Sequence, residues 1–307
     1  MSEPSNRPMG LFHLEADLRL ARENREREPI KGALALLEAE EADPLANACK
    51  AALRGQLFET LEPGNRAAAA LSLVDLTGGR LDLAGIQRAL AWLTAAAMLR
   101  DHPAWQVSWS DQIAAMLDAL DGDGETSEAL TALWRGALTM AAGILLEDDE
   151  AIERGGAVYR RAVERRIHPE GYFRDIADLA DAPARYEAQV SATGAMALLA
   201  QMADLAGLDL WAYDSRAVSI STAVAYTHFY YFFPEKWRWE AGLSRERAIA
   251  IMRREGAFME LVNRRNPPQG IEQFFAEQRP LFCAWGGGLT TLTHGLTPET
   301  KRRWRFW

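Results

Sequence analysis

Apolar residues recur at helical spacing along most of the chain. The clearest set stands at i, i+3, i+4, i+8, i+11 and i+15 and comprises Leu130, Leu133, Trp134, Leu138, Ala141 and Leu145. This spacing places the set on one face of an α-helix. The alternation of Val, Ile and Thr with polar residues that is typical of half-buried strands is nearly absent. The pattern therefore predicts an all-α fold.

Prolines and glycines divide this pattern into separate helices. Pro29, Pro44 and Pro63 each stand just inside the start of a helical stretch, where proline is tolerated. Gly78-Gly79 and the segment 121–124 interrupt the pattern between helices. The predicted helices cover residues 10–27, 30–41, 44–60, 63–76, 82–100, 110–120, 127–146, 148–167, 184–206, 215–231, 244–263 and 268–277.

The number and length of these helices favour one kind of arrangement. About a dozen helices with short links are typical of antiparallel hairpins packed in a ring or a stack. The chain has no fixed repeat period, which disfavours a regular solenoid. No glycine- and proline-rich linker divides it, so we expect a single domain over residues 1–307.

The composition limits the class of protein. Of the 307 residues, 49% are hydrophobic and 25% are charged, which suits a large core and excludes a disordered chain. No uninterrupted apolar run approaches the roughly 18 residues of a transmembrane helix, so no membrane span is expected. The formal net charge of -9 argues against a nucleic-acid partner, because binding a phosphate backbone needs a basic surface. A polyanionic partner would need a local basic patch.

The cysteines and the N-terminal segment bear on cofactors and location. Cys49 and Cys283 stand far apart and cannot form a disulfide framework or a zinc knuckle. Two free thiols are the favoured interpretation, a single long-range disulfide stays open, and no metal is expected. Residues 1–28 lack the basic and apolar regions of a secretion signal, which predicts a cytoplasmic protein, or a periplasmic or secreted one if a leader was removed.

Aromatic residues become frequent after Trp211. They gather with one histidine in the set Tyr226, His228, Phe229, Tyr230, Tyr231, Phe232, Phe233, Trp237 and Trp239. Aromatic faces suit sugar rings, because they offer flat apolar area beside polar edges. A well-packed helix end would explain the same composition, so both interpretations stay open.

Three stretches of the chain resemble the alginate-lyase family of polysaccharide lyases. The first is AMALLAQMADLAGLDLW, from Ala195 to Trp211, and the second is RPLFCAWGGGLTTLT, from Arg279 to Thr293. The third runs from Trp134 to Phe173, through an acidic turn at 147–149 and a glycine-centred loop at 168–173. Together they cover roughly residues 127–293, and the resemblance depends on their order and spacing. The resemblance implies an incomplete (α/α) toroid with a cleft.

The resemblance also implies a reaction. Lyases of this type cleave a uronic-acid polymer by β-elimination, without a metal or an organic cofactor. An Asn, His or Arg neutralises the sugar carboxylate, which makes the neighbouring proton acidic. A His or Tyr removes that proton, and a Tyr commonly returns one to the leaving oxygen. The implied partner is therefore an acidic polysaccharide or oligosaccharide.

The chain departs from the family at the positions that carry this chemistry. Where the family has Asn-Asn-His before the tryptophan matched by Trp134, this chain has Ala129, Leu130 and Thr131. An ungapped match places Ala188 at the catalytic tyrosine, and Tyr186 lies two positions away. Ala129, Leu130 and Thr131 cannot neutralise a carboxylate or accept a proton at neutral pH.

We therefore predict a site from the remaining candidates. Tyr186 is the candidate acid, His228 the candidate base, and Arg185 or Arg174 the candidate carboxylate clamp. The predicted substrate-binding residues are Trp134, Arg174, Gln189, Tyr230, Tyr231, Arg279 and Trp285. Structural roles are the competing interpretation: a buried aromatic ring for Tyr186, a helix-end hydrogen bond for His228 and an ion pair for Arg279. The basic, aromatic C-terminal segment 301–307 would contact an acidic partner or dock on the domain itself.

Three functions remain compatible with these observations. The first is a polysaccharide lyase whose catalytic groups have been rebuilt on the same cleft. The second is a protein that binds carbohydrate without cleaving it, as part of an exopolysaccharide system. The third is a helical interaction scaffold with no sugar ligand. The sequence alone predicts neither the polymer and its linkage nor the oligomeric state.

Overall fold

The described part of the chain is built almost wholly from helices. The computed structural model describes residues 7–76, 82–122, 129–176, 182–239 and 243–296. The helices are α1 Glu15–Glu23, α2 Ile30–Glu38, α3 Pro44–Phe58, α4 Leu61–Leu71, α5 Leu83–Met98, α6 Val107–Gly122, α7 Ala129–Leu146, α8 Asp149–Arg161, α9 Ala182–Leu205, α10 Ile220–Phe232, α11 Arg245–Glu255, α12 Met259–Arg265, α13 Ile271–Gln278 and α14 Thr290–His294. A π-helix spans Ala162–Arg166, and 3-10 turns span Arg174–Ile176, Pro234–Lys236 and Gly256–Phe258. Within these ranges β-structure is limited to isolated bridges, which confirms the all-α prediction.

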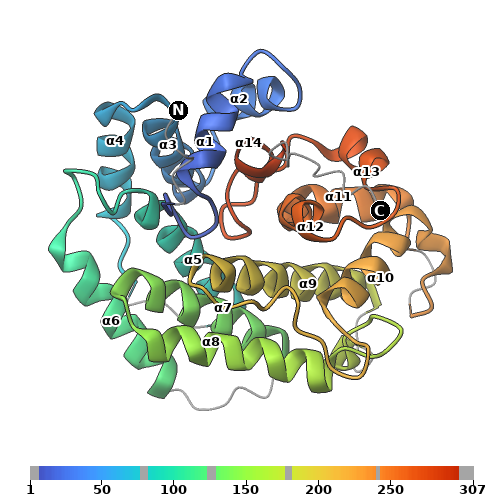
Figure 1. Cartoon of the computed structure of the whole chain (residues 1–307). Coiled ribbons are helices and arrows are strands. Elements are labelled where there is room, and N and C mark those ends of the chain that lie inside the picture. Colours follow the sequence, from blue (N-terminus) through green and yellow to red (C-terminus); the bar gives the residue numbers. More distant parts are fainter. Residues whose placement is uncertain (1–6, 77–81, 123–128, 177–181, 240–242, 297–307) are drawn as a thin grey trace, which may run out of the picture.

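The helices form an incomplete ring of hairpins, an (α/α) toroid (Figure 1). α3 packs on α4 and α5, α5 packs on α7, and α7 packs on both α8 and α9. α9 then contacts α10, α11 and α12. The two ends of the described chain meet, because α14 packs on α1 and α2. The predicted toroid is therefore confirmed.

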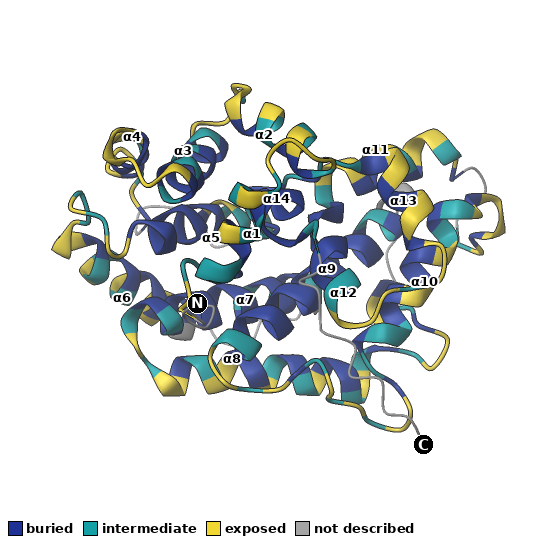
Figure 2. Cartoon of the chain, turned by 45° about the horizontal axis from the view of Figure 1, so that its top comes forward, coloured by how far each residue is buried: buried dark blue, intermediate teal, exposed yellow. Residues whose placement is uncertain are grey.

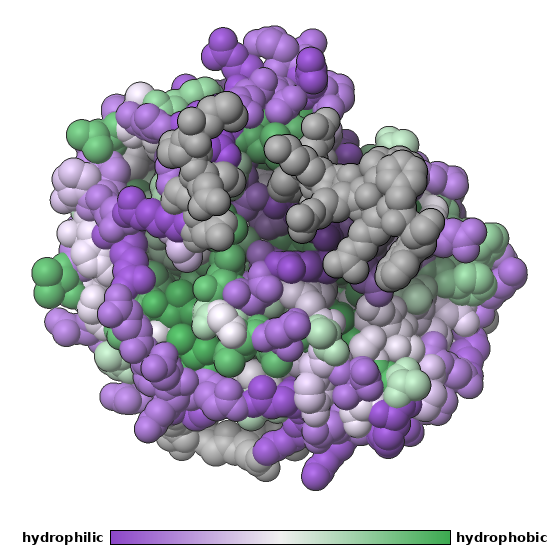
Figure 3. Space-filling model, viewed as in Figure 1, coloured by the Kyte–Doolittle hydropathy of each residue, from purple (hydrophilic) through white to green (hydrophobic). Residues whose placement is uncertain are grey.

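The core follows α5, α7 and α9 through the interior (Figure 2). α5 is buried without a break from Ala89 and α9 from Ala188 to Ala203. A helix that is buried on all sides belongs to the core, and its many alanines let neighbouring helices approach closely. On the face shown in Figure 3, hydrophobic residues gather around α7 and hydrophilic residues form the periphery.

Several predicted helices differ from the structure: 63–76 ends at Leu71, 215–231 begins at Ile220, and three further differences have a visible cause. α1 begins only at Glu15, because the Asp17 side chain accepts the Leu14 N–H at 2.8 Å and starts the helix there. The predicted helix 244–263 is two helices, since the chain turns at the 3-10 segment Gly256–Phe258, where glycine weakens helical continuity. α14 was not predicted, because its five residues are too short to show a period.

Both cysteines are buried and free, which confirms the interpretation as two thiols. The Cys49 thiol donates to the Ala91 carbonyl at 3.3 Å. Burial raises the pKa of Cys49 to about 12, so the thiol stays protonated and unreactive at neutral pH. No helix in the described ranges is both long and apolar enough to cross a membrane.

Candidate functional site

The loop 167–173, which follows the π-helix, is held in place by Gln189 of α9. The Phe173 N–H donates to Gln189 Oε1 at 3.1 Å. Gln189 Nε2 donates to the Gly171 carbonyl at 3.1 Å and to Thr227 Oγ1 at 3.2 Å. Gln189 was predicted to bind a sugar hydroxyl, and its buried amide group is instead engaged with the loop and with α10. Gln189 therefore positions the loop 167–173 and has no amide atom left to bind a sugar.

Gly171 lets this loop lie directly on α10. Its φ is 108°, a conformation that favours glycine. A Cβ at this position would lie 2.5 Å from the Thr222 carbonyl oxygen and 2.5 Å from Tyr226 Cβ. The close approach brings Tyr172, the next residue in the chain, against the aromatic residues of α10.

An aromatic cluster forms where this loop meets α10 and the segment after it. The cluster consists of Tyr172, Tyr226, Tyr230, Trp237 and Trp239, whose neighbouring ring centroids lie 4.7–6.4 Å apart. Tyr226 and Tyr230 share one face of α10 because they are four residues apart. Nε1 of the buried Trp237 has no hydrogen-bond partner among the described residues. Buried polar atoms are usually paired, so this unpaired N–H is an exception.

Cations lie over and beside the aromatic cluster. The Arg238 guanidinium is 4.6 Å from the Tyr172 ring centroid and 4.4 Å from that of Trp239. It also pairs with Glu170 at 2.9 Å, and both side chains are exposed. Arg185 Nη1 donates to the Trp239 carbonyl at 3.0 Å. The acidic chain therefore has positive charge at this position, which an anionic sugar requires.

Tyr186 lies beneath the aromatic cluster and is fully buried. Its hydroxyl donates to the Thr227 carbonyl at 3.2 Å, and its ring meets Trp237 edge to face at 5.5 Å. Burial raises the pKa of Tyr186 far above its usual range, so the phenol stays protonated. That is the protonation state of an acid, but in this structure the proton points at the backbone of α10.

A separate cluster of polar side chains, the second polar group, lies between α7, α9 and α11. Trp134 Nε1 of α7 donates to Ser191 Oγ of α9 at 3.0 Å. Glu255, the last residue of α11, has a side chain that is 9% exposed and pairs with Arg254 at 2.8 Å. Arg254 also pairs with Glu187 of α9 at 2.5 Å.

Burial raises the pKa of the Glu255 carboxyl. Arg254 and a hydrogen bond from the Ser191 side chain lower it in part, whereas the charge of Glu187 raises it further. Glu255 Oε2 is buried and has no hydrogen-bond partner among the described residues. A carboxyl with one unpaired oxygen and a raised pKa is typical of groups that exchange protons near neutral pH.

His228 and Tyr231 occupy other faces of α10 from the aromatic cluster. His228 Nε2 donates to the Gln269 carbonyl at 3.1 Å, which leaves Nδ1 as the acceptor of the neutral ring. Burial lowers the pKa of His228, so the ring is neutral at pH 7 as a base must be. Tyr231 is fully buried and donates to Glu277 at 2.7 Å. Neither residue contacts Tyr186 through a described hydrogen bond.

The remaining predicted residues are spread over the ring. Arg279 pairs with the buried Glu260, with Nε–Oε1 and Nη2–Oε2 distances of 2.7 Å each. Arg174 is exposed in the 3-10 turn before α9, and Trp285 is half-buried in the turn before α14. Two of the glycines after Trp285 have positive φ angles, 106° at Gly287 and 75° at Gly288.

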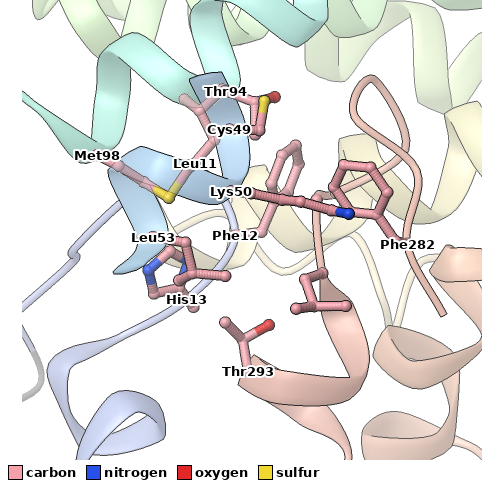
Figure 4. Close-up of a pocket in the computed structure, with 13 residues that line it drawn as sticks. Leu11, Phe12, His13, Cys49, Lys50, Leu53, Thr94, Met98, Phe282 and Thr293 are labelled. Atoms are coloured by element: carbon pink, nitrogen blue, oxygen red, sulfur yellow. The ribbon is translucent and has the colours of Figure 1, made fainter. Parts of the chain in front are cut away.

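A cavity also lies between α3, α5 and the turn before α14 (Figure 4). Its lining includes His13, Cys49, Lys50, Thr94 and Phe282. Its volume is about 10 Å³, at the lower limit for a single water molecule, so it cannot hold a sugar. In the ranges that the structure describes, no three His, Cys, Asp or Glu side chains are placed to hold a metal ion.

The structure thus brings part of the predicted site together. Arg185, Tyr186, Gln189 and Tyr230 lie around the aromatic cluster, and Trp134 lies beside the second polar group. Tyr172, Trp237 and Trp239 were not predicted as site residues, although the aromatic run after Trp211 was a signal for the two tryptophans. Ser191, Arg254 and Glu255 were also missed, because neither a serine inside a helix nor a charged residue at a helix end has a distinguishing pattern. Residues 301–307 lie outside the described residues.

These features define a helical toroid with an aromatic surface that carries arginine side chains. Residues 61–237, more than half of the chain, match the profile of the family described as alginate lyase. The chain belongs to the alginate lyase family. A search of curated proteins found no match.

Solved structures agree with this family assignment. A histidine-to-alanine variant of alginate lyase A1-III complexed with tetrasaccharide has a TM-score of 0.68 and 14% identity, over 95% of this chain and 96% of that one. Alginate lyase A1-III from Sphingomonas species A1 has a TM-score of 0.64 and 16% identity, over 89% and 79%. An alginate lyase from Bacteroides ovatus has a TM-score of 0.63 and 13% identity, over 82% and 73%. At these identities the likeness establishes the shared fold.

Proposed function

We propose that this protein is a polysaccharide lyase that cleaves an acidic, uronate-containing polysaccharide by β-elimination. The observation that carries the proposal is the family match over residues 61–237, which includes four of the five rings of the aromatic cluster. Alginate, a polymer of uronic acids, is the first substrate to test, because the similar solved structures are alginate lyases.

The chemistry of the aromatic cluster supports this proposal. Its rings offer flat apolar area that suits sugar rings. Arg238 offers a guanidinium to a sugar carboxylate. Its present partner, Glu170, is exposed, and such surface pairs contribute only about 0–1 kcal/mol. A substrate carboxylate would therefore replace Glu170 at little cost.

The test is an assay on a panel of uronate polymers that includes alginate. β-Elimination creates a carbon–carbon double bond beside the carboxylate, so ultraviolet absorbance rises as the polymer is cleaved. We expect such a rise with at least one polymer and a slower rise for Trp237→Ala. Flat traces for all polymers, from a sample shown to be folded, would contradict the proposal. Calorimetric binding of an oligosaccharide without turnover would favour the non-catalytic alternative.

Replacing Tyr186 with phenylalanine tests its predicted role as the acid. We expect the free energy of unfolding to fall by about 0.5–1.5 kcal/mol, because the buried Thr227 carbonyl loses its donor. We expect kcat to change only a few-fold, since the hydroxyl is fully buried against backbone. A fall in kcat of about 10²–10⁴ at unchanged stability would instead establish Tyr186 as the acid.

A further inference from the structure

We propose that Glu255 is the proton-transferring residue of this lyase and that Arg254 binds the uronate carboxylate beside it. This inference rests on the proposed function, because it names the groups that would perform that reaction. It begins from what the reaction needs: a cation for the sugar carboxylate, and a base close to that cation. The aromatic cluster supplies surface and positive charge, but Tyr226 does not supply a base, since burial raises the pKa of its phenol above the usual range.

The geometry around Glu255 meets both requirements. Arg254 Nη2 lies 2.8 Å from Glu255 Oε1, so the cation and the carboxyl are adjacent. The Arg254 side chain is 48% exposed and the Glu255 side chain 9% exposed, so the cation faces solvent and the carboxyl lies just beneath it. Oε2, the oxygen that Arg254 does not hold, is the one without a partner among the described residues. It is therefore the oxygen whose lone pairs are left to accept a proton.

Arg254 can exchange Glu187, the more exposed of its two carboxylate partners, for the carboxylate of a substrate. It pairs with Glu187 at 2.5 Å, and the Glu187 side chain is 41% exposed. A uronate carboxylate that displaced Glu187 from Arg254 would keep the guanidinium paired. The carbon beside that carboxylate would then lie next to Glu255. The displacement also moves the negative charge of Glu187 away from Glu255.

The hydrogen bonds behind Glu255 orient its carboxyl. Ser191 Oγ accepts from Trp134 Nε1, and the Ser191 side chain lowers the pKa of Glu255 in part. The neighbouring turns of the same helices carry Thr131 and Ala188, which do not titrate near neutral pH. The charge of Glu255 also helps to raise the pKa of the buried Cys283 thiol. Arg254, Glu187 and Ser191 are the other groups that interact with Glu255.

The proposed step balances in atoms and charge. The Glu255 carboxylate takes the proton from the carbon that bears the sugar carboxylate, whose charge Arg254 neutralises. The electron pair of that C–H bond forms the new double bond as the C–O bond to the leaving sugar breaks. Glu255, now a carboxylic acid, returns the proton to the leaving oxygen. The enzyme is restored, and no oxidant or reductant takes part.

The experiment compares wild type, Glu255→Gln and Glu153→Gln on the polymer that wild type cleaves. Glu153 is a matched control, because it is an exposed glutamate of α8 paired with Arg160, away from the site. We expect Glu255→Gln to lower kcat by about 10²–10⁴, with KM changed only a few-fold and the same unfolding temperature. Glu153→Gln is expected to keep the wild-type kcat.

Ser191→Ala gives a second, independent readout in the pH profile. The base must be deprotonated, so kcat/KM rises with pH through the pKa of Glu255. The Ser191 hydrogen bond lowers that pKa, so its removal is expected to move the acidic limb to higher pH. If Glu255→Gln does not fold, this shift decides the assignment.

The outcomes separate this inference from the proposed function. An active wild type with a fully active Glu255→Gln variant, or with an acidic limb that Ser191→Ala does not move, would overturn the assignment of Glu255 alone. A folded wild type that is inactive on every uronate polymer would overturn both.

Discussion

Replacing Arg279 with alanine is expected to lower the free energy of unfolding by about 3–5 kcal/mol, as is found when a buried ion pair loses one partner. Glu260 is fully buried, and its two oxygens accept from Arg279 Nε and Nη2 at 2.7 Å each. The Thr291 hydroxyl donates to the same carboxylate at 2.8 Å. Without the guanidinium, a buried carboxylate would keep a single donor among these contacts. Denaturant-induced unfolding measures the difference.

A surface ion pair provides the control for this prediction. Arg160 pairs with the exposed Glu153, so Arg160→Ala is expected to cost only about 0–1 kcal/mol. Arg279 was predicted from the sequence to bind substrate. If Arg279→Ala left the unfolding curve unchanged and raised KM, that prediction would be correct and the structural role would be wrong.

Acidification is expected to destabilise the protein through buried histidines. His294 is fully buried, and burial lowers its pKa well below the usual value, with further lowering by the charges of Arg264 and His13. Burial also lowers the pKa of His13, which a hydrogen bond donated to Gln56 Oε1 and the charge of Asp17 raise in part. In the unfolded chain both imidazoles take up protons near pH 6.5, whereas in the folded chain their lowered pKa values delay protonation to lower pH.

The sign of the effect follows from this difference in bound protons. Below about pH 6.5 the unfolded state binds more protons, so stability falls as the pH falls, by up to about 1.4 kcal/mol per pH unit for each histidine. Unfolding free energies measured between about pH 7 and 5 test this. We expect His294→Asn to have a shallower slope than wild type. Equal slopes would show that His294 does not contribute.

The described helices were largely predictable, because their apolar residues repeat at a local period. The stretch 184–206 was predicted within two residues of α9, since sixteen consecutive buried positions leave a clear signal. Gly256, which divides one predicted helix into α11 and α12, was not recognised as a boundary. A single glycine is tolerated in many helices, so its effect depends on what packs around it.

The candidate site was predictable only in part. The aromatic run from Tyr226 to Trp239 indicated a ring-rich surface, and the structure places Tyr230, Trp237 and Trp239 together. Nothing local marked Glu255, since its neighbours Arg253 and Arg254 suggest an ordinary solvated helix end. Its burial comes from α9, which is more than sixty residues away in the sequence at Ser191.

The sequence by itself determined the helices, the absence of strand patterns and the resemblance to a family, because these depend on periodicity and on the order of short motifs. Only the tertiary structure decided which polar groups meet. His13 and His294 had no role from sequence, yet they lie together because α14 packs on α1. Burial, pairing and pKa depend on neighbours that the chain brings from distant positions, and no local pattern records those neighbours.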